Sequence, residues 1–333
     1  MRRLGMAALI LALLGVVAGA ADARRKRASK TRKAARAAAA KVEPRVDPLT
    51  PDGLPNVQSA AVVVLDAKTG AEVWGKGGDD VRAIASTGKI FVAMLVRDQG
   101  LDLDGVTTIT KTDQQYARGG SRTRLPVGHR FKNGDLLRAM LLASDNRAVT
   151  ALGRAVGLEP DDMVEKLNDL AKKLGCKHTK FVDPVGLRGN ESTPREMALA
   201  LREALEDDVL AEIMTTRSAT IRSVAKRPEV ITYNNTNLPL QTGRFPVHGG
   251  KTGFNKPAGY CFIVAAEVGG RDLLMSFLGA DGKLTRFADF TRGAEWYEAG
   301  GKGAALKPTK VKAKDDGKKK PRIAERASGH ASL

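Results

Sequence analysis

Residues 247–280 read VHGGKTGFNKPAGYCFIVAAEVGGRDLLMSFLGA, and their pattern is that of strands. The apolar runs YCFIVAAEV and RDLLMSFLGA flank Gly269-Gly270, which predicts a β-hairpin. Near the other end of the chain, AAVVVLD at 60–66 and AEVWG at 71–75 predict a second hairpin that turns at Gly70. Strands at both ends with helical sequence between them predict one α+β domain, in which an antiparallel sheet is completed by both chain ends and flanked by helices.

The sequence between the two sets of strands has the periodicity of helices. In residues 159–175, EPDDMVEKLNDLAKKLG, apolar residues recur at helical spacing behind a proline. The run Thr193-Pro194-Arg195-Glu196 predicts a capping box, in which the Thr and Glu side chains satisfy free backbone donors at a helix start. Further helices are expected from about Thr87 through IFVAMLV, over about 133–143 and over about 284–298.

The formal net charge of the 333-residue chain is +18, and it lies in two segments near the chain ends. Residues 24–41 carry nine Lys and Arg and no acid, and residues 302–333 carry ten against three acids, whereas residues 42–301 are close to neutral. Both basic segments have too few apolar side chains to fold alone. Their composition favours a solvated tether, with binding to an anionic polymer or a membrane surface as the alternative. No aromatic residue is interleaved with the basic ones, so nucleic acid is not an expected partner.

The first 23 residues, MRRLGMAALILALLGVVAGAADA, are typical of a secretory signal peptide. Because RRKR follows at once and opposes export of that flank, an uncleaved N-terminal anchor is the alternative. The sequence therefore predicts export of the chain to the periplasm or cell envelope. The predicted organisation is a signal peptide at 1–23, a basic and Pro-containing linker at 24–54, a folded domain at 55–300 and a basic tail at 301–333.

Two common kinds of site are not indicated. The run GGKT at 249–252 is not a phosphate-binding loop, because the first glycine of that motif would fall on Phe245 and a strand follows instead of a helix. The four histidines are scattered: His129, His178, His248 and His330. Without an HExxH pairing, neither metal-assisted hydrolysis nor a Ser-His-Asp triad is indicated, and we predict no metal and no cofactor. For Cys176 and Cys261, a single disulfide and two buried free thiols are both compatible with the sequence.

A hydrolase without a usable histidine needs another base, and a lysine with a pKa depressed by burial can serve. The run ASTGKIF at 85–91 places Ser86 and Lys89 three residues apart at the start of an apolar helix, so both side chains lie on one face. At this position the backbone N–H of Ser86 can also point at a developing oxyanion. Ser-x-x-Lys is a weak signal by itself.

Two further motifs make the signal specific. Ser144-Asp145-Asn146 interrupts two apolar segments, and Lys251-Thr252-Gly253 opens a strand. Lys-Thr-Gly also occurs at 68–70, where we interpret it as a hairpin turn only. The three motifs stand in a fixed order, with 58 residues from the first serine to the second and 105 from the asparagine to the second lysine. This combination matches the signature of penicillin-binding proteins and serine β-lactamases.

The similarity extends beyond the motifs. FVDPVGLRGNESTPREMA at 181–198, YNNTNLPL at 233–240 and GKLTRFADFTRGAEWYEAG at 282–300 resemble the D-alanyl-D-alanine carboxypeptidase and endopeptidase family of low-molecular-mass penicillin-binding proteins. The resemblance covers about residues 55–300. It implies the penicillin-binding-protein or serine β-lactamase-like α+β fold, with an inserted mostly helical subdomain. It also implies a penicillin-sensitive serine peptidase that acts on peptidoglycan stem peptides in cell-wall remodelling.

The resemblance assigns three catalytic residues. Ser86 would attack the carbonyl of the penultimate D-alanine and form an acyl-enzyme, and Lys89 would take its proton. Ser144 would relay the proton to the leaving amine. The backbone N–H groups of Ser86 and Phe254 would form the oxyanion hole.

The resemblance also assigns the substrate contacts. Asn146 would hold the substrate amide, and Lys251 and Thr252 would bind the substrate carboxylate. Gly253 would let the substrate lie alongside as an added strand. Peptidoglycan and β-lactam antibiotics are the implied ligands. The resemblance does not cover the basic tails, for which anionic cell-wall polymer and a membrane surface are the candidate partners.

Two alternatives are weighed against this reading. A class A β-lactamase would add a Glu-x-x-Leu-Asn loop, but residues 175–195 offer only Asp183 and Glu191. A non-catalytic cell-wall-binding protein would keep the fold without the activity. The family usually has a bulkier residue than Thr87 and no glycine at position 88, and the glycine is expected to loosen Lys89. The C-terminal similarity to the endopeptidase branch favours activity on cross-links as well as on free stems.

Overall fold

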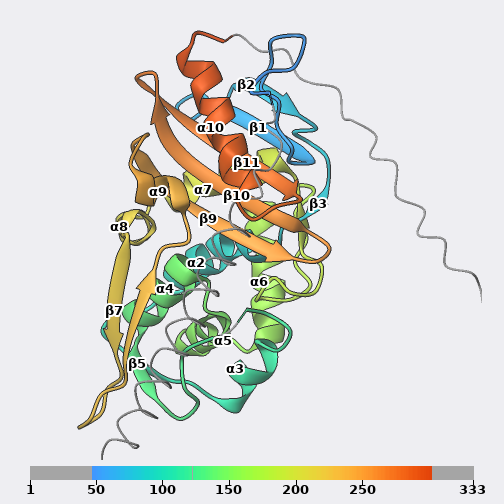
Figure 1. The fold of residues 1–333 in the computed structure, drawn as a ribbon. Helices are drawn as coiled ribbons and strands as arrows, with labels where there is room; N and C mark the ends of the chain where they lie inside the picture. Colours follow the sequence, from blue (N-terminus) through green and yellow to red (C-terminus); the bar gives the residue numbers. More distant parts are fainter. Residues whose placement is uncertain (1–46, 122, 302–333) are drawn as a thin grey trace, which may run out of the picture. The chain divides into compact units, whose positions relative to one another are not determined.

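The computed structural model describes residues 47–121 and 123–301, and its centre is a five-stranded antiparallel sheet (Figure 1). The strands are β1 (Ala61–Asp66), β2 (Glu72–Lys76), β9 (Val247–Asn255), β10 (Gly259–Val268) and β11 (Arg271–Ala280). Their order is β2-β1-β11-β10-β9, and β1 pairs with β11, so both ends of the folded region complete the sheet as predicted. Within the described residues, no helix is long and apolar enough to cross a membrane. The predicted signal peptide, most of the predicted linker and the basic tail lie outside the described residues.

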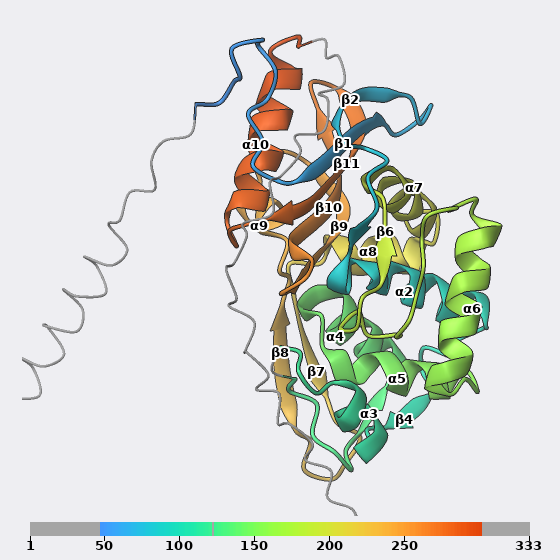
Figure 2. The same cartoon turned by 90° about the vertical axis from the view of Figure 1, so that its right-hand side faces the viewer.

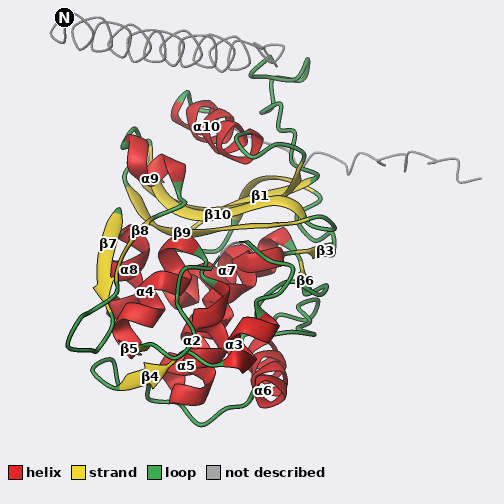
Figure 3. Cartoon of the chain, turned by 60° about the horizontal axis from the view of Figure 1, so that its bottom comes forward, coloured by secondary structure: helices red, strands yellow, loops and turns green. Residues whose placement is uncertain are grey.

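Alternation along the strands divides the apolar residues between the two faces of the sheet. In β1, Val63 and Leu65 join the large core cluster on the helical side, whereas Val62 and Val64 join a second cluster on the opposite side. Helix α10 (Thr285–Glu298) supplies aromatic side chains to this second cluster. Figure 3 shows α10 on one side of the sheet and the larger group of helices on the other. The sheet is therefore buried on both faces.

The larger group of helices forms the mostly helical part of the fold (Figure 2). Its members are α2 (Lys89–Asp98), α3 (Lys111–Tyr116), α4 (Asn133–Ala143), α5 (Asn146–Ala155), α6 (Pro160–Lys173), α7 (Pro194–Ala204) and α8 (Asp208–Thr215). The short helix α9 (Leu238–Thr242) precedes β9 in the chain. The helices predicted over 133–143, 159–175 and 284–298 are confirmed as α4, α6 and α10. The helix expected from Thr87 begins differently, because a 3₁₀ turn, η1 (Ala85–Gly88), precedes α2.

Three two-stranded ribbons were not predicted from the sequence. They are β3 (Arg82–Ala83) with β6 (Glu191–Ser192), β4 (Val106–Thr108) with β5 (Arg130–Lys132), and β7 (Ser218–Arg222) with β8 (Val230–Asn234). Strands of two or three residues are too short to show alternation. In β7 and β8 most side chains are exposed, so the apolar signal is weak as well.

The predicted capping box at the start of α7 is only half formed. The Thr193 side chain accepts the backbone N–H of Glu196 at 3.1 Å, as expected. The Glu196 carboxylate does not return to the backbone of Thr193, because it accepts the His178 N–H at 2.9 Å and the Thr179 hydroxyl at 2.7 Å. Glu196 therefore ties α7 to the preceding loop instead of closing the box.

The two cysteines do not form a disulfide. Cys176 and Cys261 are both free and buried. Burial raises the pKa of each thiol to about 11, which keeps both neutral at physiological pH. They behave as small apolar side chains.

Candidate active site

The fold brings the three sequence motifs to one cleft. Ser86 lies in η1, Lys89 begins α2, Ser144 ends α4, and residues 251–253 lie on the edge strand β9. Residues from all three motifs line a cleft of about 660 Å³, together with Phe254. Segments far apart in sequence thus meet where the sheet borders the helices.

Lys89 is the centre of this arrangement. Its Nζ lies 2.7 Å from Ser86 Oγ, 2.7 Å from Asn146 Oδ1 and 3.2 Å from Ser144 Oγ. It also donates to the Val185 carbonyl at 3.0 Å. With 1% of the residue exposed, the amine is held by protein oxygens on several sides.

The burial of Lys89 changes its protonation. Burial lowers its pKa from 10.5 to about 7, although the negative charges of Asp183 and Asp145 oppose the shift. At neutral pH a large fraction of this amine is therefore unprotonated. A neutral amine 2.7 Å from a serine hydroxyl has the contact and the proton affinity of a general base.

The glycine that departs from the family pattern fits its surroundings. A Cβ built at Gly88 would lie 3.1 Å from Phe181 Cε1 and 3.2 Å from Ile84 Cδ1, which is tight packing. The adjacent Thr87 is buried and donates its hydroxyl to the Ile84 carbonyl at 2.6 Å. Lys89 nevertheless makes four polar contacts, so the loosening expected from this glycine stays a prediction.

The turn that carries Ser144 is held by its neighbour. Ser144 has a left-handed backbone, with φ 61°, which a side chain adopts at some cost. The buried Asp145 accepts the N–H groups of Arg124 at 2.9 Å and Arg147 at 3.1 Å. It also accepts the Tyr233 hydroxyl at 2.8 Å. The middle residue of the motif is therefore a positioning residue, and it fixes the serine and asparagine that face Lys89.

Gly253 lets β9 lie directly against η1. A Cβ at this position would be 2.9 Å from the backbone nitrogen of Thr87 and 3.0 Å from that of Ser86. The strand that continues into Phe254 therefore runs beside the backbone of Ser86. Two N–H groups from such adjacent segments are what an oxyanion hole requires.

We expect Gly253→Ala to lower the rate of acylation by roughly 100-fold, because the methyl group would meet backbone atoms that cannot rotate away. The measurement is the second-order rate of acylation by a chromogenic β-lactam, with far-UV circular dichroism to check the fold. The matched control is Gly293→Ala on α10, where a built Cβ meets nothing within 4 Å. An unchanged rate in Gly253→Ala would contradict the packing argument.

Lys251 lies behind the cleft and close to other cations. It is 1% exposed, and its Nζ donates to the Thr252 carbonyl at 2.9 Å. Burial lowers its pKa well below its ordinary value, and the charges of Lys89 and Arg286 add to this effect. An anion bound in the cleft would favour the protonated form of Lys251. The hydroxyl of Thr252 lies 2.7 Å from that of Thr236, which fixes it at the cleft wall.

Arg286 is a site residue that the sequence reasoning missed. It lies on α10, is 5% exposed and lines the same cleft. Its guanidinium donates to the Gly253 carbonyl at 2.7 Å and to the Cys261 carbonyl at 3.0 Å. It therefore supports β9 from behind and adds positive charge beside Lys251. A single arginine in the last helix gives no signal of this in the sequence.

Asp183 is the second residue whose role was missed. Its carboxylate accepts the four consecutive backbone N–H groups of residues 185–188, at 2.7 to 3.0 Å. This nest of donors shapes the turn that presents the Val185 carbonyl to Lys89. At the same turn, Asn255 on β9 donates to the Gly186 carbonyl at 3.1 Å.

We expect Asp183→Ala to lower the free energy of unfolding by about 2–4 kcal/mol, because four backbone amides, two of them in buried hydrogen bonds, lose their acceptor. The measurement is chemical denaturation followed by tryptophan fluorescence. The control is Glu191→Gln, since this residue is exposed and lies nearby in sequence, on β6. Equal stability of Asp183→Ala and the wild type would refute a structural role for the nest.

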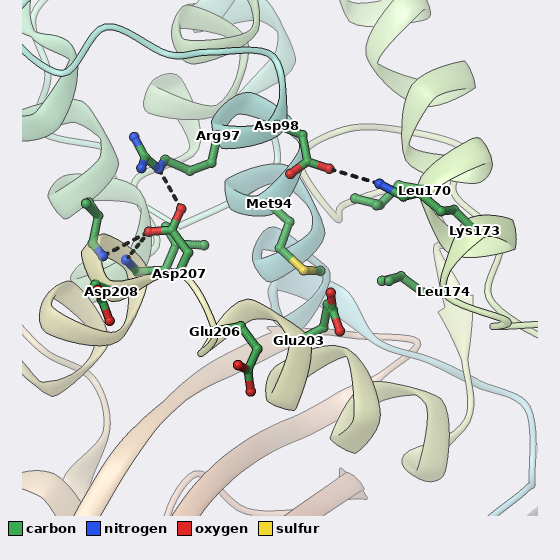
Figure 4. Close-up of a pocket in the computed structure, with 12 residues that line it drawn as sticks. Met94, Arg97, Asp98, Leu170, Lys173, Leu174, Glu203, Glu206, Asp207 and Asp208 are labelled. Carbon is green, nitrogen blue, oxygen red and sulfur yellow. Dashed lines mark hydrogen bonds and ion pairs between the residues drawn. The ribbon is translucent and has the colours of Figure 1, made fainter.

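A separate cleft of about 530 Å³ between α2, α6, α7 and α8 holds none of the motif residues (Figure 4). Its acidic side chains include Asp207, which accepts the Arg97 guanidinium at 2.7 Å and caps α8, and Asp98, which lies 3.7 Å from Lys173. No Ser, Thr or Cys is among its lining residues. Among the described residues, this cleft therefore lacks a hydroxyl or thiol nucleophile.

The comparisons with known proteins identify the family of the chain. The model of the D-alanyl-D-alanine carboxypeptidase family matches residues 49–282. The D-alanyl-D-alanine endopeptidases of Pseudomonas aeruginosa and Escherichia coli are 32% and 28% identical, over 74% of this chain in each case and 81% and 79% of theirs. The crystal structure of the Streptomyces K15 DD-transpeptidase is 27% identical and superimposes with a TM-score of 0.67 over 74% of this chain and 98% of that one.

Proposed function

The chain belongs to the D-alanyl-D-alanine carboxypeptidase family of penicillin-binding serine peptidases, and we propose that Ser86 is its nucleophile and Lys89 its general base. The observation that carries the proposal is the 2.7 Å contact between Lys89 Nζ and Ser86 Oγ in a buried site where the lysine pKa is about 7. The substrate class is peptidoglycan stem peptides that end in D-alanyl-D-alanine.

Acylation begins when neutral Lys89 takes the proton of Ser86. The freed Oγ attacks the carbonyl of the penultimate D-alanine, and the negative oxygen that forms is held by the backbone N–H groups of Ser86 and Phe254. Ser144, whose Oγ is 3.2 Å from Lys89 Nζ, passes the proton to the leaving amine. D-Alanine then departs and an ester on Ser86 remains.

Substrate binding uses the positive wall of the cleft. The terminal carboxylate faces Lys251 and the hydroxyl of Thr252, and Arg286 adds charge on the same side. Asn146 offers its side-chain amide to the peptide, and Gly253 leaves the edge of β9 open to an added strand. None of the described residues that line this cleft is acidic, which favours an anionic peptide end.

Water completes the cycle by attacking the ester, with Lys89 again accepting a proton. A β-lactam acylates the same serine, but the part that would leave stays attached after ring opening. We therefore propose that penicillin forms a slowly hydrolysed ester on Ser86.

Two structural observations weigh against the β-lactamase alternative. Asp183 already accepts four amides, and the side chain of Glu191 is exposed. Asp183 is thus engaged by the backbone, and neither carboxylate is among the residues that line the catalytic cleft, where the loop glutamate of a class A β-lactamase would activate a deacylating water. The non-catalytic alternative does not account for the 2.7 Å contact between Lys89 and Ser86.

We propose that cross-linked peptides are substrates as well as free stems. The support is that two of the relatives reported above are named endopeptidases, together with the C-terminal similarity described from the sequence. Both reactions use the same serine and differ in how much peptide lies beyond the scissile bond.

The test is to incubate the purified chain with a pentapeptide muropeptide and, separately, with its cross-linked dimer, and to separate the products by liquid chromatography and mass spectrometry. Loss of one D-alanine from the monomer shows carboxypeptidase action, and conversion of dimer to monomer shows endopeptidase action. A folded chain that is acylated by penicillin but cleaves neither muropeptide would reject the proposed substrate. Rapid hydrolysis of nitrocefin would favour the β-lactamase alternative.

The functions proposed for the segments near the chain ends rest on their composition and charge. Peptidoglycan lies outside the cytoplasmic membrane, and enzymes of this family are typically exported, so we propose that residues 1–23 direct export. We propose that residues 24–41 and 302–333 bind anionic cell-wall polymer. Sedimentation with purified sacculi should fall when the basic segments are deleted and when salt is raised. Equal sedimentation of a chain without these segments would reject their role.

A further inference from the structure

Three side chains with metal-binding atoms meet on the surface of the sheet, away from the motif residues. They are His248, Glu267 and Asp272, which belong to the neighbouring strands β9, β10 and β11. Their ligand atoms all lie within 4.8 Å of one another, and His248 Nε2 is 2.9 Å from Asp272 Oδ1. Glu267 and Asp272 are paired across the two strands, so the backbone fixes their spacing. All three residues are exposed, which leaves the group open to a dissolved ion.

A β-bulge places the histidine in this group. Ala265 of β10 pairs with Gly249, but the next residue, Ala266, pairs with Val247. His248 is therefore the extra residue of β9, with no partner of its own on β10. Bulges change the direction of side chains and often lie next to functional sites. Here the bulge residue reaches the carboxylate of a residue two strands away.

We propose that His248, Glu267 and Asp272 form a binding site for a divalent transition-metal ion, with Zn²⁺ as the best-suited common ion. One imidazole nitrogen and two carboxylate oxygens are ligands that Zn²⁺ accepts, at bonds of about 2.0–2.2 Å. Two ligands of one ion at such bond lengths lie about 3.0–3.4 Å apart. The observed 2.9 Å between His248 and Asp272 needs only a small change, and Glu267, whose carboxylate lies within 4.8 Å of both, would supply the third ligand. Water would fill the open positions.

Neighbouring charges set a limit on the affinity. Lys68, Arg202 and Arg271 line the hollow that contains His248 and Asp272. The guanidinium of Arg271 lies 3.7 Å from Asp66, which offsets part of its charge. Lys68 and Arg271 are exposed, and Arg202 is half-buried. Solvent screens their repulsion of an ion. We therefore expect micromolar affinity, weaker than that of a closed structural zinc site.

The position of the site gives the ion a structural effect. His248 precedes Lys251 by three residues on the same strand, and β9 is the edge strand of the sheet. An ion held by all three residues would tie this edge to β10 and β11. Binding to the folded chain alone raises the midpoint of unfolding. Zn²⁺ is thus expected to stabilise the strand that carries the Lys-Thr-Gly motif.

The test is isothermal titration of the full chain, without an affinity tag and after removal of metal by EDTA, with ZnCl₂ at pH 7.5. The expected result for the wild type is one saturable site and a rise in the thermal midpoint with Zn²⁺. Binding should weaken at least tenfold in His248→Ala and in Asp272→Asn. The thermal midpoint of each variant in EDTA shows whether it is folded, and Glu267→Gln serves as a second probe of the same site.

The matched control is His178→Gln, because His178 is also an exposed histidine beside a carboxylate, with its Nδ1 3.0 Å from Glu196, and is not part of the three-residue group. Its Zn²⁺ affinity should equal that of the wild type. His330 is replaced by Gln in every protein, so that the histidine of the basic tail does not contribute. The proposal is overturned if the wild type shows no saturable site, if His248→Ala binds as tightly as the wild type, or if His178→Gln loses as much affinity.

Discussion

Ser86→Ala is expected to abolish covalent labelling by benzylpenicillin and to lower peptide hydrolysis by on the order of 10⁶-fold, as does loss of the nucleophile in other serine peptidases. The physical reason is that no other hydroxyl lies 2.7 Å from the Lys89 amine among the described residues. The measurement is the intact mass of the chain after incubation with the drug. The wild type should gain the mass of one penicillin, and the variant should gain none.

The control for this prediction is another buried serine. Ser276 on β11 is fully buried, and its hydroxyl has no partner in the described part of the chain, so Ser276→Ala should be labelled like the wild type. A labelled Ser86→Ala would place the nucleophile elsewhere. Absence of label in a folded wild type would mean either an inert site or rapid turnover. Assay of the spent penicillin would then distinguish these two cases.

The parts of the site that could be predicted from the sequence are those that short local patterns encode. Ser86 and Lys89 share one face because they are one helical turn apart, and this needs no tertiary information. The central sheet could be predicted because its strands are five to ten residues long and apolar. The order and spacing of the motifs then linked three local patterns to one family.

The contributions of Arg286 and Asp183 could not be predicted, because each acts through contacts that only the folded chain creates. Arg286 reaches the Gly253 carbonyl from 33 residues away in sequence. The proposed metal site could not be predicted for the same reason. His248 lies far from Asp272 in the sequence and meets it only through the pairing of three strands and a bulge. Pairing register and bulges have no local signature.

At Gly88 a local rule and the tertiary structure give different expectations. Helix propensity alone predicts a weakened helix start and a poorly placed Lys89. In the structure, residue 88 belongs to a 3₁₀ turn, and Phe181 and Ile84 leave little room for a side chain. The tertiary packing of this turn therefore decides which residue fits, and the propensity scale does not apply.

The rate of acylation by penicillin is expected to rise with pH through a midpoint near 7 and to level off above it. Only the neutral amine of Lys89 can accept the proton of Ser86, and burial lowers the pKa of this lysine from 10.5 to about 7. The rate rises with pH, and does not fall, because protonation of Lys89 at low pH removes the base. Stopped-flow measurement of acylation between pH 5 and 9 with a chromogenic β-lactam gives the profile.

Lys89→Met is expected to reduce the acylation rate about 10³-fold and to remove the midpoint near 7, because no base remains beside Ser86. Lys89→Arg should be equally slow, since a guanidinium stays protonated. The matched control is Lys76→Met, which removes a half-buried lysine that donates to the Ser59 carbonyl at 2.9 Å and is not among the residues that line the catalytic cleft. It should keep both the rate and the midpoint. If Lys89→Met retained a rate that rises through pH 7, the titrating base would have to be a different residue.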